Sequence, residues 1–173
     1  MVKPSFTDGP AFPGNAVCGV DAIPHIYAKN RNVFCVIARS NNGNVSVYEM
    51  VDDKPVNFWL DLDPATMTAA RARGRTHDRD ETSVMDRPAY GFTINEINGK
   101  RVMKIRSLPR PIVVIKGKNG YTGFTKINGH MCILKYIWVK LKPILGVVPV
   151  VEYIDIVGYD RVTKEKRSER VRK

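Results

Sequence analysis

The residues that could carry out acid–base chemistry are few and lie far apart in the chain. The histidines are His25, His77 and His130. His77 lies in residues 76–81, a stretch rich in carboxylates, where an acidic neighbour could orient the imidazole as a general base. No serine or cysteine in the context of a catalytic nucleophile lies nearby in the sequence, so a solvated charged loop is the favoured interpretation.

Two further groupings could hold a metal ion. His130 and Cys132 are two residues apart, so on a strand their side chains would share a face. A zinc site needs three or four ligands, and no paired Cys-x-x-Cys supplies the others. Asp61 and Asp63 could offer oxygen ligands to calcium, but a helix-capping Asp63 beside an ordinary surface acid explains them better.

The chain also lacks the loop that cradles a phosphate, because no glycine-rich segment with a Lys-Ser or Lys-Thr ending precedes a predicted helix. We therefore expect a protein that is not an enzyme. It should have no catalytic residues, no metal site and no cofactor.

Basic residues are the stronger functional signal. The net charge is +11, and residues 99–173 hold 18 Lys/Arg against 5 Asp/Glu. Such a field favours nucleic acid, an acidic protein surface or anionic lipid as partner, and the alternative is a solvated face without a partner. The candidate partner-binding residues are Arg101, Lys104, Arg106, Arg110, Lys116, Lys118, Lys126, Lys164, Lys166, Arg167 and Arg170.

Aromatic residues help to choose among these partners. Nucleic-acid binders usually interleave exposed aromatic side chains with cations, so that bases can stack on them. Here the aromatic residues lie mostly inside apolar runs, and Tyr121 is the main exception. An acidic protein lattice requires only complementary charge and shape, so it is the favoured partner.

A central strand organises the elements that would position these residues. Residues 131–141 are rich in β-branched and aromatic side chains and are apolar on both parities, apart from Lys135, which is typical of a strand covered on both faces. One parity carries Cys132, Leu134, Tyr136 and Trp138. Asn128-Gly129 before this run is a strong hairpin signal, because both central residues of a type I′ turn need positive φ.

Further strands are predicted on either side of it. Asn-Gly pairs recur at residues 42, 98 and 119, each between strand-like runs. The pattern predicts an all-β, mainly antiparallel fold, a β-sandwich or partly open barrel of about 8–9 strands with one short helix. The predicted strands cover residues 32–38, 45–50, 56–60, 92–97, 101–105, 112–115, 121–127, 131–141 and 147–157.

The remaining segments complete a two-part organisation. Residues 1–30 are rich in proline and glycine and predict an extended N-terminal arm, while residues 31–173 form a single β-sandwich-like domain with a basic C-terminal tail. The short helix should start at Asp63-Pro64 and stop at Gly74. Residues 75–88 are expected to be an exposed loop, and residues 161–173 a frayed edge strand or a helical turn.

Composition restricts the cellular setting. Three cysteines at wide spacings imply no disulfide framework, and Cys35 and Cys132 lie inside apolar runs, where they should be buried. No apolar run is long enough to span a membrane, and the N-terminus has no signal or transit peptide pattern. We expect an intracellular, reducing location.

The order of several short motifs resembles one known family. Arg39-Ser40-Asn41, Ala89-Tyr90-Gly91 and Ile127-Asn128-Gly129 are individually weak, but their order is fairly specific. Further matching positions are Phe34, Asn44, Val45, Tyr48, Pro55, Val56, Trp59, Cys132, Leu134, Val150, Tyr153, Ile154, Gly158, Asp160, Thr163 and Glu169. Residues 32–171 thus resemble the domain-of-unknown-function family 4833, which implies a compact β domain, no assigned reaction and no catalytic residues to carry over.

Together these features predict a non-catalytic structural or docking component of a larger intracellular assembly. The favoured partner is an acidic tubulin lattice, including the luminal face of ciliary or flagellar microtubules, which would place the protein in the cytoplasm on the cytoskeleton. The alternatives are an RNA-binding ribonucleoprotein component, and a small-ligand-binding or enzymatic β domain that uses the loop around His77.

Overall fold

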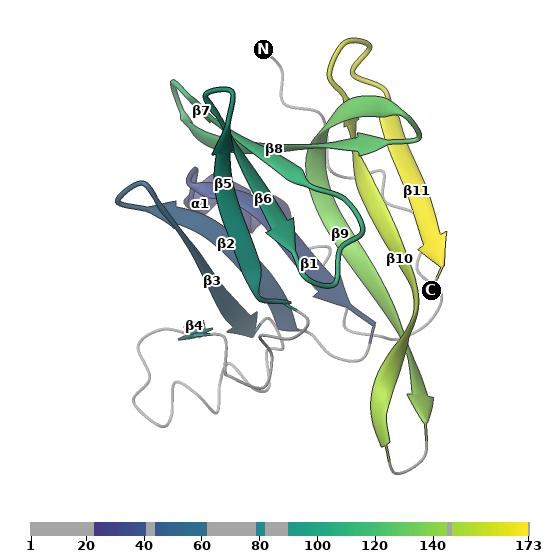
Figure 1. Cartoon of the computed structure of the whole chain (residues 1–173). Coiled ribbons are helices and arrows are strands. Elements are labelled where there is room, and N and C mark those ends of the chain that lie inside the picture. The colour runs from purple at the N-terminus through teal and green to yellow at the C-terminus, as the bar shows by residue number, and fades with distance from the viewer. Residues whose placement is uncertain (1–22, 41–43, 62–78, 82–89, 145–146, 173) are drawn as a thin grey trace.

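The structure is a computed structural model that describes residues 23–40, 44–61, 79–81, 90–144 and 147–172 (Figure 1). One short helix precedes eleven strands within these residues. The elements are α1 (Ile23–Lys29), β1 (Val33–Arg39), β2 (Asn44–Val51), β3 (Lys54–Asp61), β4 (Arg79–Glu81), β5 (Phe92–Ile97), β6 (Lys100–Ile105), β7 (Ile112–Gly117), β8 (Gly120–Ile127), β9 (His130–Ile144), β10 (Val147–Asp160) and β11 (Lys166–Arg172).

All eleven strands belong to one rolled, barrel-like sheet that is organised around β9. The strand order is β4-β3-β2-β1-β9-β8-β7-β6-β5, and β10 pairs with β9 on its other edge and with β11. The β1–β9 pair is parallel, and all other pairs in the described strands are antiparallel. The mainly antiparallel all-β class and the central strand are confirmed.

A β-bulge divides β9. Tyr136 pairs with Val157, and Leu134 pairs with Gly158, so β9 has one additional residue, Lys135, between two consecutive residues of β10. A bulge of this kind reverses the alternation of side chains along the strand. In the sequence, Lys135 interrupts the apolar residues of one parity. In the structure it is the extra residue of the bulge, and beyond it the side chains of β9 point to the opposite face.

The bulge changes which residues share a face. Cys132 and Leu134 pack in the same core cluster as Ile137, whereas Tyr136 and Trp138 pack in a second cluster. The expectation that Cys132, Leu134, Tyr136 and Trp138 lie on one face is wrong, because strict alternation does not continue through a bulge.

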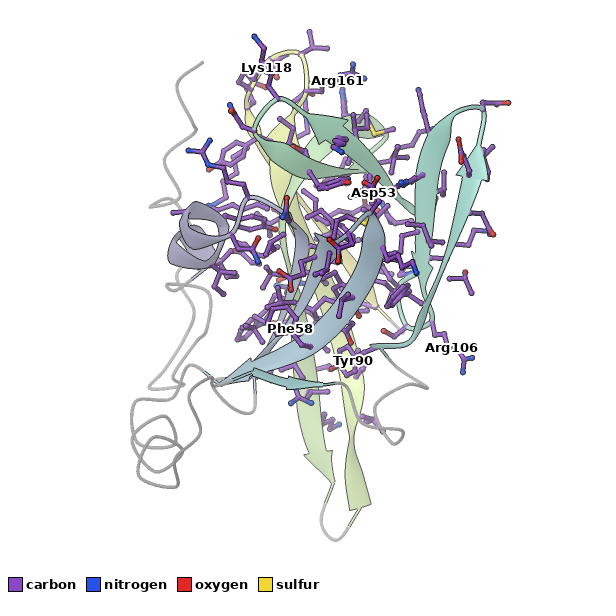
Figure 2. The ribbon with its side chains drawn as sticks, turned by 90° about the vertical axis from the view of Figure 1, so that its left-hand side faces the viewer. Asp53, Phe58, Tyr90, Arg106, Lys118 and Arg161 are labelled. Carbon is purple, nitrogen blue, oxygen red and sulfur yellow. The ribbon has the colours of Figure 1, made fainter. Side chains whose placement is uncertain are left out.

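The two core clusters lie on opposite sides of β1 and β9. The larger one fills the space inside the rolled sheet, and the smaller one lies beneath α1, which adds Ile23 to it. Figure 2 shows α1 on one side of β2 and the β5–β6 hairpin on the other. The larger cluster includes Phe34, Tyr48, Met50, Met103, Ile105, Ile112, Val114, Ile127, Leu134, Ile137, Ile154 and Ile156.

Two of the Asn-Gly pairs form the turns that the sequence indicates. Asn98-Gly99 and Asn128-Gly129 have positive φ at both residues, as a type I′ turn requires. Asp52-Asp53 between β2 and β3 has the same backbone signature. Aspartate and asparagine tolerate this region better than other side chains do.

The Asn119-Gly120 pair behaves differently. Gly117 pairs with Gly120, so Lys118 and Asn119 are the two loop residues and Gly120 is the first residue of β8. A Cβ on Gly120, whose φ is +121°, would lie 2.0 Å from the carbonyl oxygen of Arg31. This glycine lets the β7–β8 hairpin approach the segment between α1 and β1, and the Tyr121 N–H donates to the same Arg31 carbonyl at 2.9 Å.

Several segments differ from the sequence-based expectations. Residues 23–29 of the predicted extended arm are helical, and β4 lies within the predicted loop 75–88. Residues 166–172 form an edge strand, which is one of the two alternatives expected for residues 161–173. These additions raise the strand number above the eight or nine expected. The rest of the arm, the helix predicted from Asp63 and the loop residue His77 lie outside the described residues.

Cys35 and Cys132 are buried and not disulfide-bonded, which confirms the prediction that they are buried. Burial also raises the pKa of both thiols above its ordinary value, so both are protonated at neutral pH. In the described part of the chain, no helix has both the length and the apolar character that crossing a bilayer requires.

Candidate functional site

Five of the eleven predicted partner-binding cations form ion pairs inside the domain. Arg101 and Lys116 lie near Asp53, Arg110 pairs with Glu169, Arg167 pairs with Asp160, and Arg170 pairs with Asp155. A cation that is hydrogen-bonded to its own carboxylate is less available to a partner. The sequence could not reveal these pairs, because most of them join distant strands.

The Arg110–Glu169 pair is the best formed of these interactions. Both guanidinium NH₂ groups of Arg110 donate to the carboxylate of Glu169, at 2.7 and 2.8 Å, and Glu169 also accepts the N–H of Asn128 at 2.6 Å. The hydrogen bonds from Arg110 and Asn128 lower the pKa of Glu169 below its usual value. This arrangement connects the β6–β7 segment, the β8–β9 turn and β11, so Arg110 has a structural role.

Asp53 forms a second network at the β2–β3 turn. It accepts a hydrogen bond from the Tyr121 hydroxyl and lies 3.7 Å from the Lys116 amine and 3.8 Å from the Arg101 guanidinium. Arg101 also donates to the Asp53 backbone carbonyl at 3.0 Å. The Tyr121 hydrogen bond and the Lys116 charge lower the pKa of Asp53. Tyr121, the aromatic residue expected to be free for stacking, is therefore already engaged.

Asp160 closes the β10–β11 hairpin and is almost fully buried. One carboxylate oxygen accepts the N–H groups of Val162 and Thr163, and the other accepts from Arg167 at 2.8 Å. The half-exposed His130 places Nδ1 3.4 Å from the second oxygen. These hydrogen bonds lower the pKa of Asp160 to about 2. The His130–Asp160 contact resembles an acid–base pair, but the carboxylate already accepts the hydrogen bonds that hold the β10–β11 turn.

We expect Asp160 to make the stability of the domain depend on acid pH. Its pKa is lower in the folded protein than the usual 3.8, so its contribution is present at neutral pH and is lost as the pH falls from about 4 towards 2. Urea unfolding should show Asp160→Asn to be less stable than the wild type at pH 7, with a difference that shrinks towards pH 2. A difference of equal size at both pH values would contradict this role.

The other six predicted cations make no ion pair with another described residue: Lys104, Arg106, Lys118, Lys126, Lys164 and Lys166. They do not form one cluster. Figure 2 shows Lys118 and Arg161 near the same end of the molecule and Arg106 well away from them. Strand register brings three of the six, Lys104, Lys126 and Lys166, to one side of the sheet.

We call this side, opposite the larger core cluster and ending at the bulge of β9, the outer face of strands β5 to β9. Because side chains alternate along a strand, it carries the residues between the core positions Met103, Ile105, Ile112, Val114 and Ile127. The outer-face positions are Thr93, Asn95, Ile97, Lys100, Val102, Lys104, Val113, Ile115, Thr122, Phe124, Lys126, Met131 and Ile133.

An apolar row crosses the outer face. Val102 pairs with Val113, Val113 with Phe124, and Phe124 with Ile133, so four half-buried apolar side chains from four strands lie next to one another. On one side of this row, Ile97 and Ile115 are 49% and 37% exposed. Neighbouring apolar side chains that are exposed on a folded domain are a common feature of protein-binding sites.

Cations lie on both sides of the apolar row, because Lys100 pairs with Ile97 and the others lie on the side away from Ile97 and Ile115. Lys126 pairs with Met131, whose carbonyl accepts the N–H of Arg161, and Lys104 lies further along the same side of the sheet. The Arg161 guanidinium lies 5.7 Å from the centroid of the Phe124 ring. None of the outer-face positions in the described strands is an aspartate or glutamate. The outer face thus combines apolar contact area with uncompensated positive charge.

The sequence alone predicts part of this surface. It identified Lys104 and Lys126, but it did not identify Arg161, Ile97 or Ile115 as surface residues of one face. The alternation in β5 and β7 could have assigned the two isoleucines to the outer face, but which parity is buried depends on the rolled sheet. Among the described residues, no cluster of three or more His, Cys, Asp or Glu side chains could hold a metal ion.

Comparison with protein families agrees with the resemblance seen in the sequence. A family model described as Domain of unknown function (DUF4833) matches residues 34–170, which is more than half of the chain. Comparisons with curated proteins and with solved structures gave no significant match. The chain, with the outer face of β5 to β9 inside the matched region, belongs to the family described as Domain of unknown function (DUF4833).

Proposed function

We propose that this domain is a non-catalytic docking component of a larger assembly, and that its outer face binds an acidic protein surface. The observation that carries the proposal is the composition of that face. Exposed and half-buried apolar side chains lie beside cations that have no carboxylate partner among the described residues, and no acidic residue occupies the face. Apolar contact would supply affinity, and the cations would select acidic partners.

An acidic protein fits this face better than RNA does. Sheets that bind single-stranded RNA present several aromatic rings for base stacking. Phe124 is the only aromatic residue among the outer-face positions of the described strands, and Arg161 already lies over its ring. Ile97 and Ile115 would contribute little to binding a phosphate backbone, whereas protein interfaces bury such side chains.

The first acidic assembly to test is polymerised tubulin, by cosedimentation across a salt series. Reversing two outer-face charges, in Lys104→Glu/Lys126→Glu, should weaken binding about tenfold or more, because two attractions become repulsions. The matched control Lys54→Glu/Lys142→Glu changes the net charge equally but leaves the outer face intact, and it should change affinity by less than about threefold. Binding to tubulin would place the protein on the cytoskeleton, including the microtubules of a cilium or flagellum.

A second double variant separates protein from RNA as the partner. Ile97→Ser/Ile115→Ser removes exposed apolar contacts without changing charge, so it should weaken binding to a protein and leave RNA retention unchanged. Equal loss in the outer-face and control charge variants would show that binding follows net charge alone and would overturn the proposal. RNA retention that depends on Lys104 and Lys126 but not on the isoleucines would support a ribonucleoprotein component instead.

A further inference from the structure

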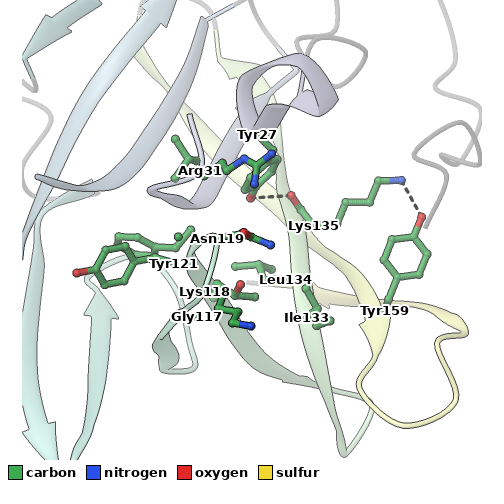
Figure 3. Close-up of a pocket in the computed structure, with 15 residues that line it drawn as sticks. Tyr27, Arg31, Gly117, Lys118, Asn119, Tyr121, Ile133, Leu134, Lys135 and Tyr159 are labelled. Atoms are coloured by element: carbon green, nitrogen blue, oxygen red, sulfur yellow. Dashed lines mark hydrogen bonds between the residues drawn. The ribbon is translucent and has the colours of Figure 1, made fainter. Parts of the chain in front are cut away.

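A cavity of about 460 Å³ lies where α1 meets the sheet, next to the end of the apolar row (Figure 3). Its walls come from α1, the segment entering β1, the β7–β8 hairpin, β9 and the end of β10. This volume is within the range of cavities that hold small organic molecules. The inference drawn from this cavity does not depend on the proposed docking function.

The interior of the cavity is mainly apolar. Val33, Phe34, Ile133 and Leu134 line it together with glycines of the β7–β8 hairpin. Tyr27 adds its ring, while its hydroxyl donates to the Lys135 carbonyl at 3.0 Å. A ligand body would therefore meet rings and hydrocarbon.

The polar side chains at one wall of the cavity are engaged with one another. The Lys135 amine, buried in the bulge of β9, donates to the Tyr159 hydroxyl at 3.4 Å and lies 5.4 Å from the centroid of that ring. Burial raises the pKa of Tyr27 well above its usual 10.0, so Tyr27 remains a neutral donor at physiological pH. These contacts help to fix the shape of the wall.

The mouth of the cavity differs in chemistry from its interior. Arg31 enters from the α1 side and Lys118 from the tip of the β7–β8 hairpin (Figure 3). Both residues are exposed, and neither forms an ion pair with another described residue. Asn119 lies between them and offers an amide. The mouth is thus suited to a single anionic group.

The two sides of the mouth are held together by the backbone. The Tyr121 N–H donates to the Arg31 carbonyl at 2.9 Å, and Gly120 makes this approach possible because it lacks a Cβ. The backbone segments that carry the two cations are therefore held side by side before any ligand arrives.

We propose that this cavity binds a small amphipathic carboxylate. The alkyl or aryl body would occupy the apolar interior, and the carboxylate would lie between Arg31 and Lys118, where charge-assisted hydrogen bonds are available. A neutral molecule of the same shape would leave these two cations without a counter-charge, and a cationic one would be repelled.

Calorimetric titration of the full chain with a series of linear fatty acids, from octanoate to hexadecanoate, tests the apolar part of the proposal. Affinity should rise about fourfold for each added methylene until the cavity is filled, and then stop rising. At a fixed length of twelve carbons, dodecanoate should bind at least tenfold more tightly than 1-dodecanol or dodecyltrimethylammonium. Equal affinity for the three head groups would overturn the assignment of a carboxylate.

Variants place the ligand in the cavity. Arg31→Glu/Lys118→Glu changes two exposed residues and should weaken dodecanoate binding about tenfold or more. Lys142→Glu, on the exposed distal part of β9, is the control and should change binding by less than about twofold. Thr122→Phe introduces a ring into the cavity wall and should abolish binding of the longer acids. If this last variant does not fold, the charge variants still decide.

Two further outcomes would overturn the proposal. One is dodecanoate binding that is unaffected by both Arg31→Glu/Lys118→Glu and a correctly folded Thr122→Phe variant. The other is retention by anionic phospholipid vesicles without saturable binding of any free acid, because it would show that the cations recognise a lipid surface. Loss of tubulin binding in the outer-face variants has no bearing on either result, so the two proposals fail independently.

Discussion

Replacing Trp138 by alanine is expected to lower the free energy of unfolding by about 3–5 kcal/mol. The side chain is only 4% exposed and lies in the smaller core cluster with Ala38, Val47 and Tyr136. Trp138 pairs with Ala38 in the parallel contact between β1 and β9, so removing the indole leaves a cavity beside the strand pair that joins two parts of the sheet. The effect therefore combines lost burial with a void that the surrounding strands cannot fill.

Chemical denaturation with urea, followed by circular dichroism, measures this loss. The control is Val162→Ala, which removes apolar atoms from a side chain that is 85% exposed and should change stability by less than about 0.5 kcal/mol. A loss below about 1 kcal/mol for Trp138→Ala would mean that the ring is not part of a packed core, and that the assignment of β9 as the central strand is wrong.

Gly123→Ala should destabilise the domain by about 1–3 kcal/mol, which is the usual range for overpacking. A Cβ at this position would lie 2.3 Å from the carbonyl oxygen of Phe34 and 3.3 Å from a methyl group of Ile112. The first contact is with backbone, which cannot move aside as a flexible side chain could. β8 would have to separate from β1 next to β9, with which both strands pair.

Gly117→Ala is the matched control, because it makes the same chemical change in the adjacent strand of the same hairpin. A Cβ there would meet only the Gly120 carbonyl, at an ordinary 3.6 Å. Its effect should be within about 0.5 kcal/mol of zero. Thermal unfolding of the two variants in parallel measures the difference, and equal midpoints would show that β8 and β1 are not in close contact at Gly123.

The pairing of charges explains why net charge alone is a poor guide to the binding residues. Arg110 and Glu169 are 59 residues apart in the chain, and Arg101 and Asp53 are 48 apart, yet each pair interacts in the folded domain. Five of the eleven predicted partner-binding cations are partly neutralised in this way. Of the six cations without such a pair, Lys104 and Lys126 lie on the outer face, to which Arg161 is added.

What the sequence determined by itself is largely local. A β-branched and aromatic run marks β9, because such side chains suit a strand covered on both faces, and Asn98-Gly99 and Asn128-Gly129 mark their turns, because their backbone needs positive φ. The same local signals place most of the other strands and the burial of Cys35 and Cys132. The family resemblance is also carried by the order of short motifs.

Only the tertiary structure decided the features that depend on contacts between distant residues. The bulge at Lys135 depends on the register between β9 and β10, and it reassigns Tyr136 and Trp138 to another face. The parallel β1–β9 pair, the cavity beneath α1 and the outer face likewise arise where strands meet. Local periodicity describes which residues of one strand share a side, but only the way in which the strands pack determines which side is buried.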